Sequence, residues 1–238
     1  MVFVTIALHY RINSGLTNRK LFIHFINQFI MNKIGKINVN VKVGDVTKEA
    51  VDCIVVPQFR SEASYGGVGR SIYGAGMRKG LELYDDIVNA SPLNYGDAVI
   101  TESGRDGVWL AHVATAGANE NQLFKAVFQA IYNALKVARA KGVKSIAIPE
   151  LGTGIIGSLT QEQSAKATLG AVVYFTNIFQ NADIENITIC VFRGSTAPAE
   201  KVLARISEMD IDLFEKGEKE FDFGAWLEEM CLNASVNQ

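Results

Sequence analysis

The residues best suited to chemistry in this sequence are the glycines of a short loop at positions 150–158. The loop reads Glu150-Leu151-Gly152-Thr153-Gly154-Ile155-Ile156-Gly157-Ser158 and joins a predicted strand to a predicted helix. Glycine lets a ligand approach the backbone closely, and successive N–H groups can then cradle an anion. The following helix adds a partial positive charge at its N-terminus. The loop predicts a phosphate site, although a tight turn whose glycines supply only backbone geometry would have the same spacing.

Another glycine loop, Tyr65-Gly66-Gly67-Val68-Gly69, also follows a predicted buried strand and precedes a predicted helix. In chain order, this is the first glycine loop and the loop at 150–158 is the second. Taken alone, the first loop is more typical of a structural turn. Neither loop continues into the Gly-Lys-Ser/Thr of a Walker motif, so the sequence gives no lysine or magnesium-binding hydroxyl for ATP hydrolysis.

Metal chemistry has little support in the cysteines and histidines. The chain has three of each, and none forms a Cys-x-x-Cys or His-x-x-x-His pair: Cys53, Cys190, Cys231, His9, His24 and His112. A disulfide framework and a zinc site are therefore both poorly supported, and a reducing compartment fits best. We expect a cytoplasmic protein with no cofactor and no metal.

The rest of the sequence alternates between strands and helices. This alternation is typical of a fold in which the loops that follow the strands lie together at one edge of a sheet. Residues 37–43 alternate strictly between apolar and polar, and 53–56 form a continuous apolar run that Pro57 is expected to end. The predicted order continues with a helix from the first glycine loop to about Tyr84, a hairpin at 98–113, a helix at 120–141, a strand at 145–149, a helix at 161–179, a strand at 187–192 and a helix at 198–208. This order predicts an α/β fold: a three-layer α/β/α sandwich with a mixed, largely parallel sheet.

Composition limits the classes of partner. Of 238 residues, 48% are hydrophobic, and 23 basic against 25 acidic residues give a net charge of −2, which argues against nucleic-acid binding. The apolar stretch at 21–30 is too short to span a membrane. We expect 1–30 to be an N-terminal extension upstream of a natural start at Met31, 31–208 to be the domain, and 209–238 to be a charged linker with a helical tail whose residues 221–231 could bind a protein.

Four segments in this order resemble the macrodomain, an ADP-ribose-binding module. They are Gly44-Asp45-Val46-Thr47 with the strand after it, Tyr65-Gly66-Gly67-Val68, Leu110-Ala111-His112-Val113-Ala114, and Leu151-Gly152-Thr153-Gly154-Ile155-Ile156-Gly157. The resemblance runs from about Val39 to Ile206. It implies a macrodomain-like fold and a small-molecule ligand such as ADP-ribose.

The resemblance also implies a role for each matched residue. Asp45 would accept a hydrogen bond from the adenine 6-amino group beside the Val46 N–H, and Phe192 would pack on the adenine. A turn cap and ordinary core packing are the alternatives for Asp45 and Phe192. The diphosphate would lie between two sets of loop residues, Gly66, Gly67 and Val68 on one side and Gly152, Thr153, Gly154, Ile155, Ile156 and Gly157 on the other, with Ile156 beside the distal ribose.

Two departures from the family pattern bear on catalysis. Val56-Pro57-Gln58-Phe59 stands where macrodomains commonly have Asn-Ala-Ala-Asn, so the asparagine that bonds the distal ribose is missing. Gly69 stands where hydrolytic members often have an aspartate that positions water. His112 is expected to be a core histidine with its hydrogen bonds satisfied.

The sequence therefore predicts a binding module for ADP-ribose or a related adenine nucleotide diphosphate, without efficient hydrolase activity. One alternative is an ADP-ribosyl hydrolase that orients water through Gln58, Tyr65 or Glu150. The other is a degenerate macrodomain scaffold that binds a protein.

Overall fold

The computed structural model describes residues 33–154, 157–180 and 183–208. The predicted extension at 1–30 and the predicted linker and tail at 209–238 lie outside the described residues, as do Ile155 and Ile156 of the longer glycine loop. No helix within the described ranges is long and apolar enough to cross a membrane.

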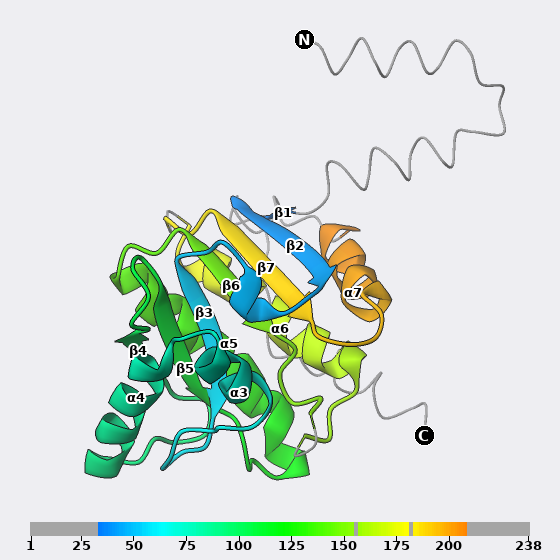
Figure 1. The fold of residues 1–238 in the computed structure, drawn as a ribbon. Coiled ribbons are helices and arrows are strands. Elements are labelled where there is room, and N and C mark those ends of the chain that lie inside the picture. Colours follow the sequence, from blue (N-terminus) through cyan, green and yellow to red (C-terminus); the bar gives the residue numbers. More distant parts are fainter. Residues whose placement is uncertain (1–32, 155–156, 181–182, 209–238) are drawn as a thin grey trace, which may run out of the picture. The chain divides into compact units, whose positions relative to one another are not determined.

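One sheet organises the described part of the chain (Figure 1). Its seven strands lie in the order β1 (Lys33–Ile34), β2 (Ile37–Val43), β7 (Asn186–Val191), β6 (Ser145–Pro149), β3 (Cys53–Gln58), β5 (Trp109–Ala114) and β4 (Ala98–Glu102). The five strands from β2 to β5 run parallel, and β1 and β4 pair antiparallel at the two edges. The predicted mixed, largely parallel sheet is confirmed, and the carboxyl ends of the five parallel strands meet at one edge.

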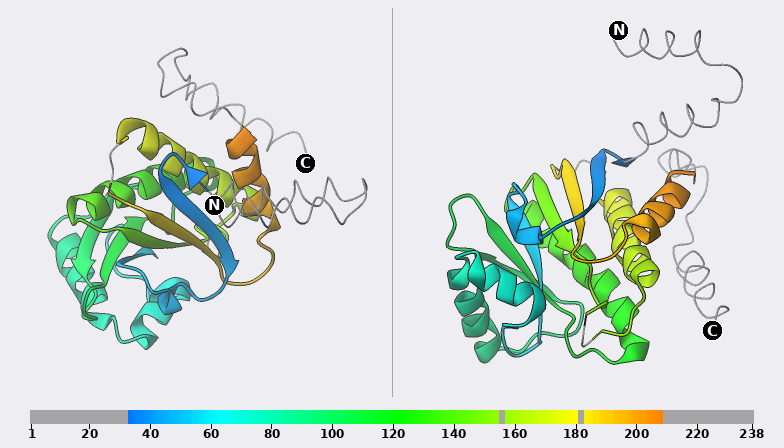
Figure 2. Two further views of the ribbon diagram at one scale, coloured as in Figure 1. Left: turned by 90° about the horizontal axis from the view of Figure 1, so that it is seen from above. Right: turned by 45° about the vertical axis from the view of Figure 1, so that its right-hand side comes forward.

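Helices cover both faces of the sheet, as Figure 2 shows. The short 3-10 helix η2 (Val46–Lys48), α3 (Gly67–Gly74) and α4 (Arg78–Ala90) lie over one face. On the other face, α5 (Glu120–Ala140), α6 (Gln161–Ile178) and α7 (Ala197–Glu208) enclose the larger hydrophobic core. The predicted three-layer α/β/α sandwich is confirmed.

The helices of the larger core follow the sequence pattern closely. The predicted inner face of α5, from Leu123 through Ile131 to Ala138, is buried. Thr160 and Gln163 form the predicted capping box at the start of α6, so both backbone N–H groups that they serve are satisfied.

Three differences from the predicted elements bear on the site. Pro57 does not end β3 but lies inside it, opposite Val113; the pairing of β3 with β6 stops at Ile54, so the missing N–H of Pro57 breaks no ladder on that side. The helix expected to end near Tyr84 is two helices, because Gly76 adopts φ +80° between α3 and α4, and α4 continues to Ala90. β7 ends at Val191, which leaves Phe192 in the loop that follows.

Candidate functional site

The carboxyl ends of three neighbouring strands are tied together by backbone hydrogen bonds. Gly44 N–H, just after β2, donates to the Val191 carbonyl at 3.0 Å, and Glu150 N–H, just after β6, donates to the Cys190 carbonyl at 3.2 Å. Asp45, Phe192 and Glu150 are therefore the first or second residues beyond three adjacent strands at one edge of the sheet.

Asp45 caps the short helix η2, as the turn-cap alternative proposed. Its Oδ1 accepts from the Thr47 N–H at 3.0 Å and from the Thr47 hydroxyl at 2.8 Å. Its Oδ2 accepts no hydrogen bond from a described residue, and the Val46 N–H donates none to a described residue. The cap thus holds the carboxylate in place and leaves one oxygen and one neighbouring N–H for a ligand.

Phe192 is not a core residue. Its side chain is 59% exposed, and the Arg193 guanidinium lies 5.3 Å from the centre of its ring. The core-packing alternative is therefore wrong, and a largely exposed aromatic side chain lies beside the end of β7.

The first glycine loop leads directly into α3. Gly66 is the N-cap of this helix and Gly67, with φ +50°, is its first residue. A Cβ on either glycine would have no atom within 4 Å, so the backbone here faces open space. The first N–H groups of a helix have no partner inside the helix and can bind an anion. Residues of α3 also contact η2, which places this loop on the same side of the sheet edge as Asp45.

The second glycine loop is anchored at its base and open at Gly154. Leu159 N–H donates to the Gly152 carbonyl at 3.0 Å, and Gly157 N–H donates to the Gly154 carbonyl at 2.8 Å. Gly152 has φ +76° and packs against Leu159, whereas a Cβ on Gly154 would meet nothing within 4 Å. The half-buried Thr153 lies between the two.

A buried polar network lies beneath the first loop, and it engages both polar ends of the Gln58 amide and both ring nitrogens of His112. Gln58 Nε2 donates to His112 Nδ1 at 3.0 Å, and Gln58 Oε1 accepts from the Ser64 N–H. His112 Nε2 can then donate to the Thr101 hydroxyl at 2.8 Å, and the ring stacks on Tyr84 with 4.8 Å between centroids. Burial lowers the pKa of His112 to about 3, so the ring stays neutral, and the predicted core histidine is confirmed.

Tyr84 and Ser64 are structural partners that the sequence analysis did not single out. The Tyr84 hydroxyl donates to the Phe59 carbonyl, so α4 fixes the backbone just after β3. The spacing of Leu81, Tyr84 and Val88 would have placed Tyr84 on the inner face of a helix, but not beside Phe59.

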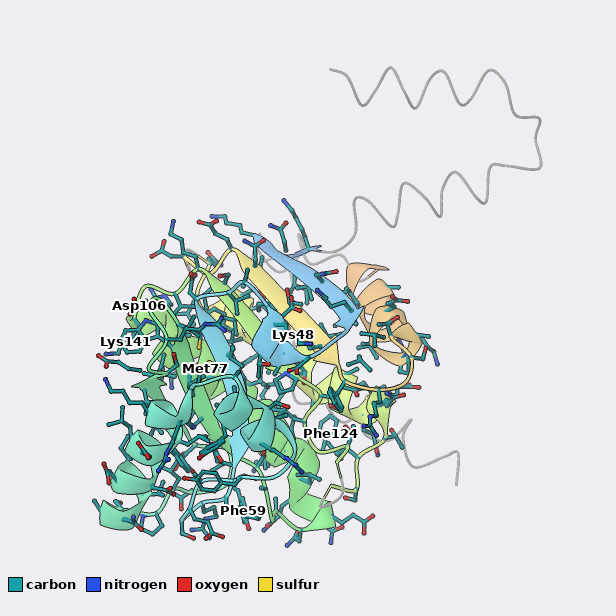
Figure 3. The ribbon with its side chains drawn as sticks, in the orientation of Figure 1. Lys48, Phe59, Met77, Asp106, Phe124 and Lys141 are labelled. Atoms are coloured by element: carbon teal, nitrogen blue, oxygen red, sulfur yellow. The ribbon has the colours of Figure 1, made fainter. Side chains whose placement is uncertain are left out.

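Phe59, which the sequence resemblance aligns with a macrodomain asparagine, points toward the loop after β5. Its ring lies close enough to Gly117 that a Cβ there would be 3.6 Å away. With Arg60 and Tyr95 it lines a cavity of about 290 Å³. Figure 3 shows Phe59 at the lower end of the molecule, opposite to Asp106 and Lys141.

Gly69, the third residue of α3, is the position that the sequence resemblance aligns with the water-positioning aspartate of hydrolytic macrodomains. It is buried, and a Cβ at this position would overlap the Ser64 carbonyl oxygen. The close approach of Ser64 to the helix therefore excludes any side chain at position 69.

Two further candidates for orienting water have partners of their own. The Tyr65 hydroxyl donates to Asp85 Oδ2 at 3.1 Å, although its side chain is exposed. The Glu150 carboxylate accepts from Gln161 Nε2, and burial raises the pKa of Glu150. Among the described residues, no three acidic, cysteine or histidine side chains lie close enough together to hold a metal ion.

Comparisons with known proteins agree with this geometry. The profile of the Macro domain family matches residues 60–168. An O-acetyl-ADP-ribose deacetylase of Escherichia fergusonii is 35% identical over 130 residues, which are 51% of this chain and 71% of that protein.

Solved structures show the same fold. A mutant Oceanobacillus iheyensis macrodomain with ADPR superposes with a TM-score of 0.65 and 21% identity, covering 74% of this chain and 97% of that one. A Trypanosoma brucei macrodomain in complex with ADP-ribose gives a TM-score of 0.58 and 19% identity, over 69% of this chain and 68% of that one. The chain belongs to the macrodomain family.

Proposed function

We propose that this protein binds ADP-ribose or a related adenine nucleotide diphosphate and does not hydrolyse it efficiently. The observation that carries the proposal is the row of features beyond adjacent strand ends: a capped carboxylate with a free oxygen, an exposed aromatic ring and two open glycine loops. Relatives that act on or bind ADP-ribose derivatives support the same ligand class.

Each feature fits one part of such a ligand. Asp45 Oδ2 would accept from the adenine 6-amino group, and the Val46 N–H would donate to a ring nitrogen. The Phe192 ring would pack on the base. The open backbone at Gly66, Gly67 and Gly154 would hold the diphosphate through N–H groups, which does not depend on side-chain identity.

Three features of the site support binding without efficient hydrolysis. General acid–base chemistry needs a group within hydrogen-bond reach of the attacking water. Both polar ends of the Gln58 amide are occupied in the core, the hydroxyl of Tyr65 is held by Asp85, and Gly69 has no side chain. These contacts disfavour Gln58 and Tyr65 as groups that orient water. Glu150, the third candidate, accepts from Gln161 and keeps acceptor capacity, so the turnover assay decides whether it acts as a base.

Calorimetry with ADP-ribose, ADP, AMP and NAD, together with a turnover assay on an ADP-ribosylated protein, tests the proposal. We expect ADP-ribose and ADP to bind within about tenfold of each other, because Phe59 cannot hydrogen-bond the distal ribose, and we expect no turnover. AMP, which lacks the diphosphate, should bind more weakly. No heat with any of these ligands at millimolar concentration would favour the protein-binding scaffold, and catalytic release of ADP-ribose would favour the hydrolase.

The variant Asp45→Asn tests the adenine contact without removing the cap. Its amide oxygen can still accept from Thr47, but its NH₂ group then faces the adenine amino group and cannot accept from it. A hydrogen bond to a charged acceptor contributes about 1.5–3 kcal/mol, so affinity should fall about tenfold to a hundredfold. The matched control is Asp106→Asn, an exposed carboxylate in the turn between β4 and β5, which should bind like the wild type.

A further inference from the structure

We propose that Glu150 recognises the ribose that carries the adenine: its carboxylate accepts a hydrogen bond from a hydroxyl of this ribose and disfavours ligands phosphorylated there. The inference rests on the proposed function, because it concerns the same ligand. It adds a specificity-determining residue that the glycine loops and Asp45 do not supply.

Strand order places Glu150 between the two halves of the ligand. In the sheet, β6 lies between β7 and β3. The proposed site holds the base beyond β2 and β7 and the diphosphate at the loops after β6 and β3. The ribose that joins them would then lie over the end of β6. Glu150 is the first residue after that strand, and its N–H donates to the Cys190 carbonyl, two residues before Phe192.

The Glu150 carboxylate has acceptor capacity to spare. Gln161 Nε2 lies 3.1 Å from one carboxylate oxygen and 3.4 Å from the other. No other described residue donates a hydrogen bond to this carboxylate. An ionised carboxylate offers about four acceptor positions, so most are free for a ligand hydroxyl. The side chain is half-buried, and burial raises its pKa, as expected for a carboxylate with few donors.

The side chain of Gln161 is itself fixed in position. It begins α6, and a Cβ on Gly194 would lie 3.0 Å from its Nε2, so the loop after β7 closes over the amide. Gln161 therefore orients Glu150 from the side of the helix. The arrangement follows the chemistry by which an acidic residue reads a ribose hydroxyl in dinucleotide-binding folds, where an added phosphate would be repelled.

Calorimetry of the full chain with ADP, 2′-deoxy-ADP and 3′-deoxy-ADP tests this role in the wild type and in Glu150→Gln. In the wild type, at least one deoxy nucleotide should bind about tenfold or more weakly than ADP. Glu150→Gln keeps the size of the side chain but loses its charge, so this ratio should shrink to about threefold. The matched control is Glu185→Gln, an exposed carboxylate just before β7 at the other end of the strand, which should keep the wild-type ratio.

A gain of binding provides a check that misfolding cannot imitate. ADP-ribose carrying a phosphate on the adenosine ribose should bind Glu150→Gln about tenfold more tightly than it binds the wild type, because the like charge is removed. If ADP binds the wild type but both deoxy nucleotides bind equally well, or if Glu150→Gln discriminates as strongly as the wild type, this inference is wrong and the proposed function stands. If no adenine nucleotide binds the wild type, the proposed function itself fails.

Discussion

Asp52 and Ser145 join the starts of β3 and β6 through reciprocal hydrogen bonds. The N–H and hydroxyl of Ser145 donate to Asp52 Oδ2 at 2.8 and 2.9 Å, and the Ser145 hydroxyl oxygen accepts from the Asp52 N–H at 2.9 Å. Burial favours a raised pKa for Asp52, but these bonds and one from the Lys144 N–H outweigh it and lower the pKa. The pair lies at the amino ends of the strands, at the edge opposite to the candidate site.

Because of this placement, Asp52→Asn should separate stability from binding. An amide in place of the carboxylate loses charge-assisted bonds, so the free energy of unfolding should fall by about 1–3 kcal/mol in urea denaturation. ADP-ribose affinity, measured by calorimetry below the unfolding transition, should stay within about twofold. A loss of binding free energy as large as the loss in the free energy of unfolding would show that the two edges of the sheet are coupled.

His112 should make stability depend on pH. Its pKa is about 3 in the folded protein and near 6.5 when unfolded, so between these values the unfolded chain binds the extra proton. The contribution of His112 to the free energy of unfolding is complete above pH 6.5. It is lost as the pH falls, with a slope that approaches about 1.4 kcal/mol per pH unit. Urea denaturation at pH 7, 6 and 5 measures the slope, and His112→Gln should show less of it. Equal slopes in the two proteins would mean that His112 is not buried as a neutral ring.

Gln58 should act as a positioning residue for the first glycine loop. Gln58→Ala would leave His112 Nδ1 and the Ser64 N–H without partners, and each unsatisfied buried group costs about 1–3 kcal/mol. We expect a large loss of stability in urea denaturation, together with weaker ADP-ribose binding because the 59–66 segment is released. Gln122→Ala, on the exposed side of α5, is the control and should change stability by less than about 0.5 kcal/mol. Full stability in Gln58→Ala would contradict this role.

The sequence predicts features that depend on residues close together along the chain, and the structure adds contacts between residues far apart along it. Helices α5 and α6 and the parallel pairing of β6 with β7 follow from local periodicity and crossover length, and they are confirmed. The role of Gln58 depends on His112, 54 positions away, and no pattern along the chain reports such a contact.

The same reasoning applies to single residues. Pro57 is typical of a strand end, yet it lies inside β3 because β6 stops pairing before it. Phe192 is exposed because β7 ends one residue earlier than its apolar run, a boundary that depends on the register with β2. The exclusion of a side chain at Gly69 arises from Ser64, in a loop whose path the sequence does not determine.

Restoring the missing acid should not create a hydrolase. A side chain at position 69 would collide with the Ser64 carbonyl, so Gly69→Asp should unfold at a lower temperature, with a cost of at least about 1–3 kcal/mol. The control is Gly74→Asp at the end of α3, where a Cβ has open space around it and no positive φ is required. Thermal denaturation and the turnover assay check both variants. A stable Gly69→Asp protein that releases ADP-ribose would show that only the acid was missing.

Gly154 and Gly157, two of the three glycines of the second loop, should respond in opposite ways. Gly154→Glu adds a side chain to open space, so its melting temperature should stay within a few degrees of the wild type, but its bulk and negative charge would occupy the diphosphate site and abolish ADP-ribose binding. Gly157→Ala would instead collide with the Gly152 carbonyl and should lower the melting temperature. Gly74→Glu adds the same charge at an equally open glycine away from the loop and should bind normally. Retained binding by a folded Gly154→Glu protein would place the diphosphate elsewhere.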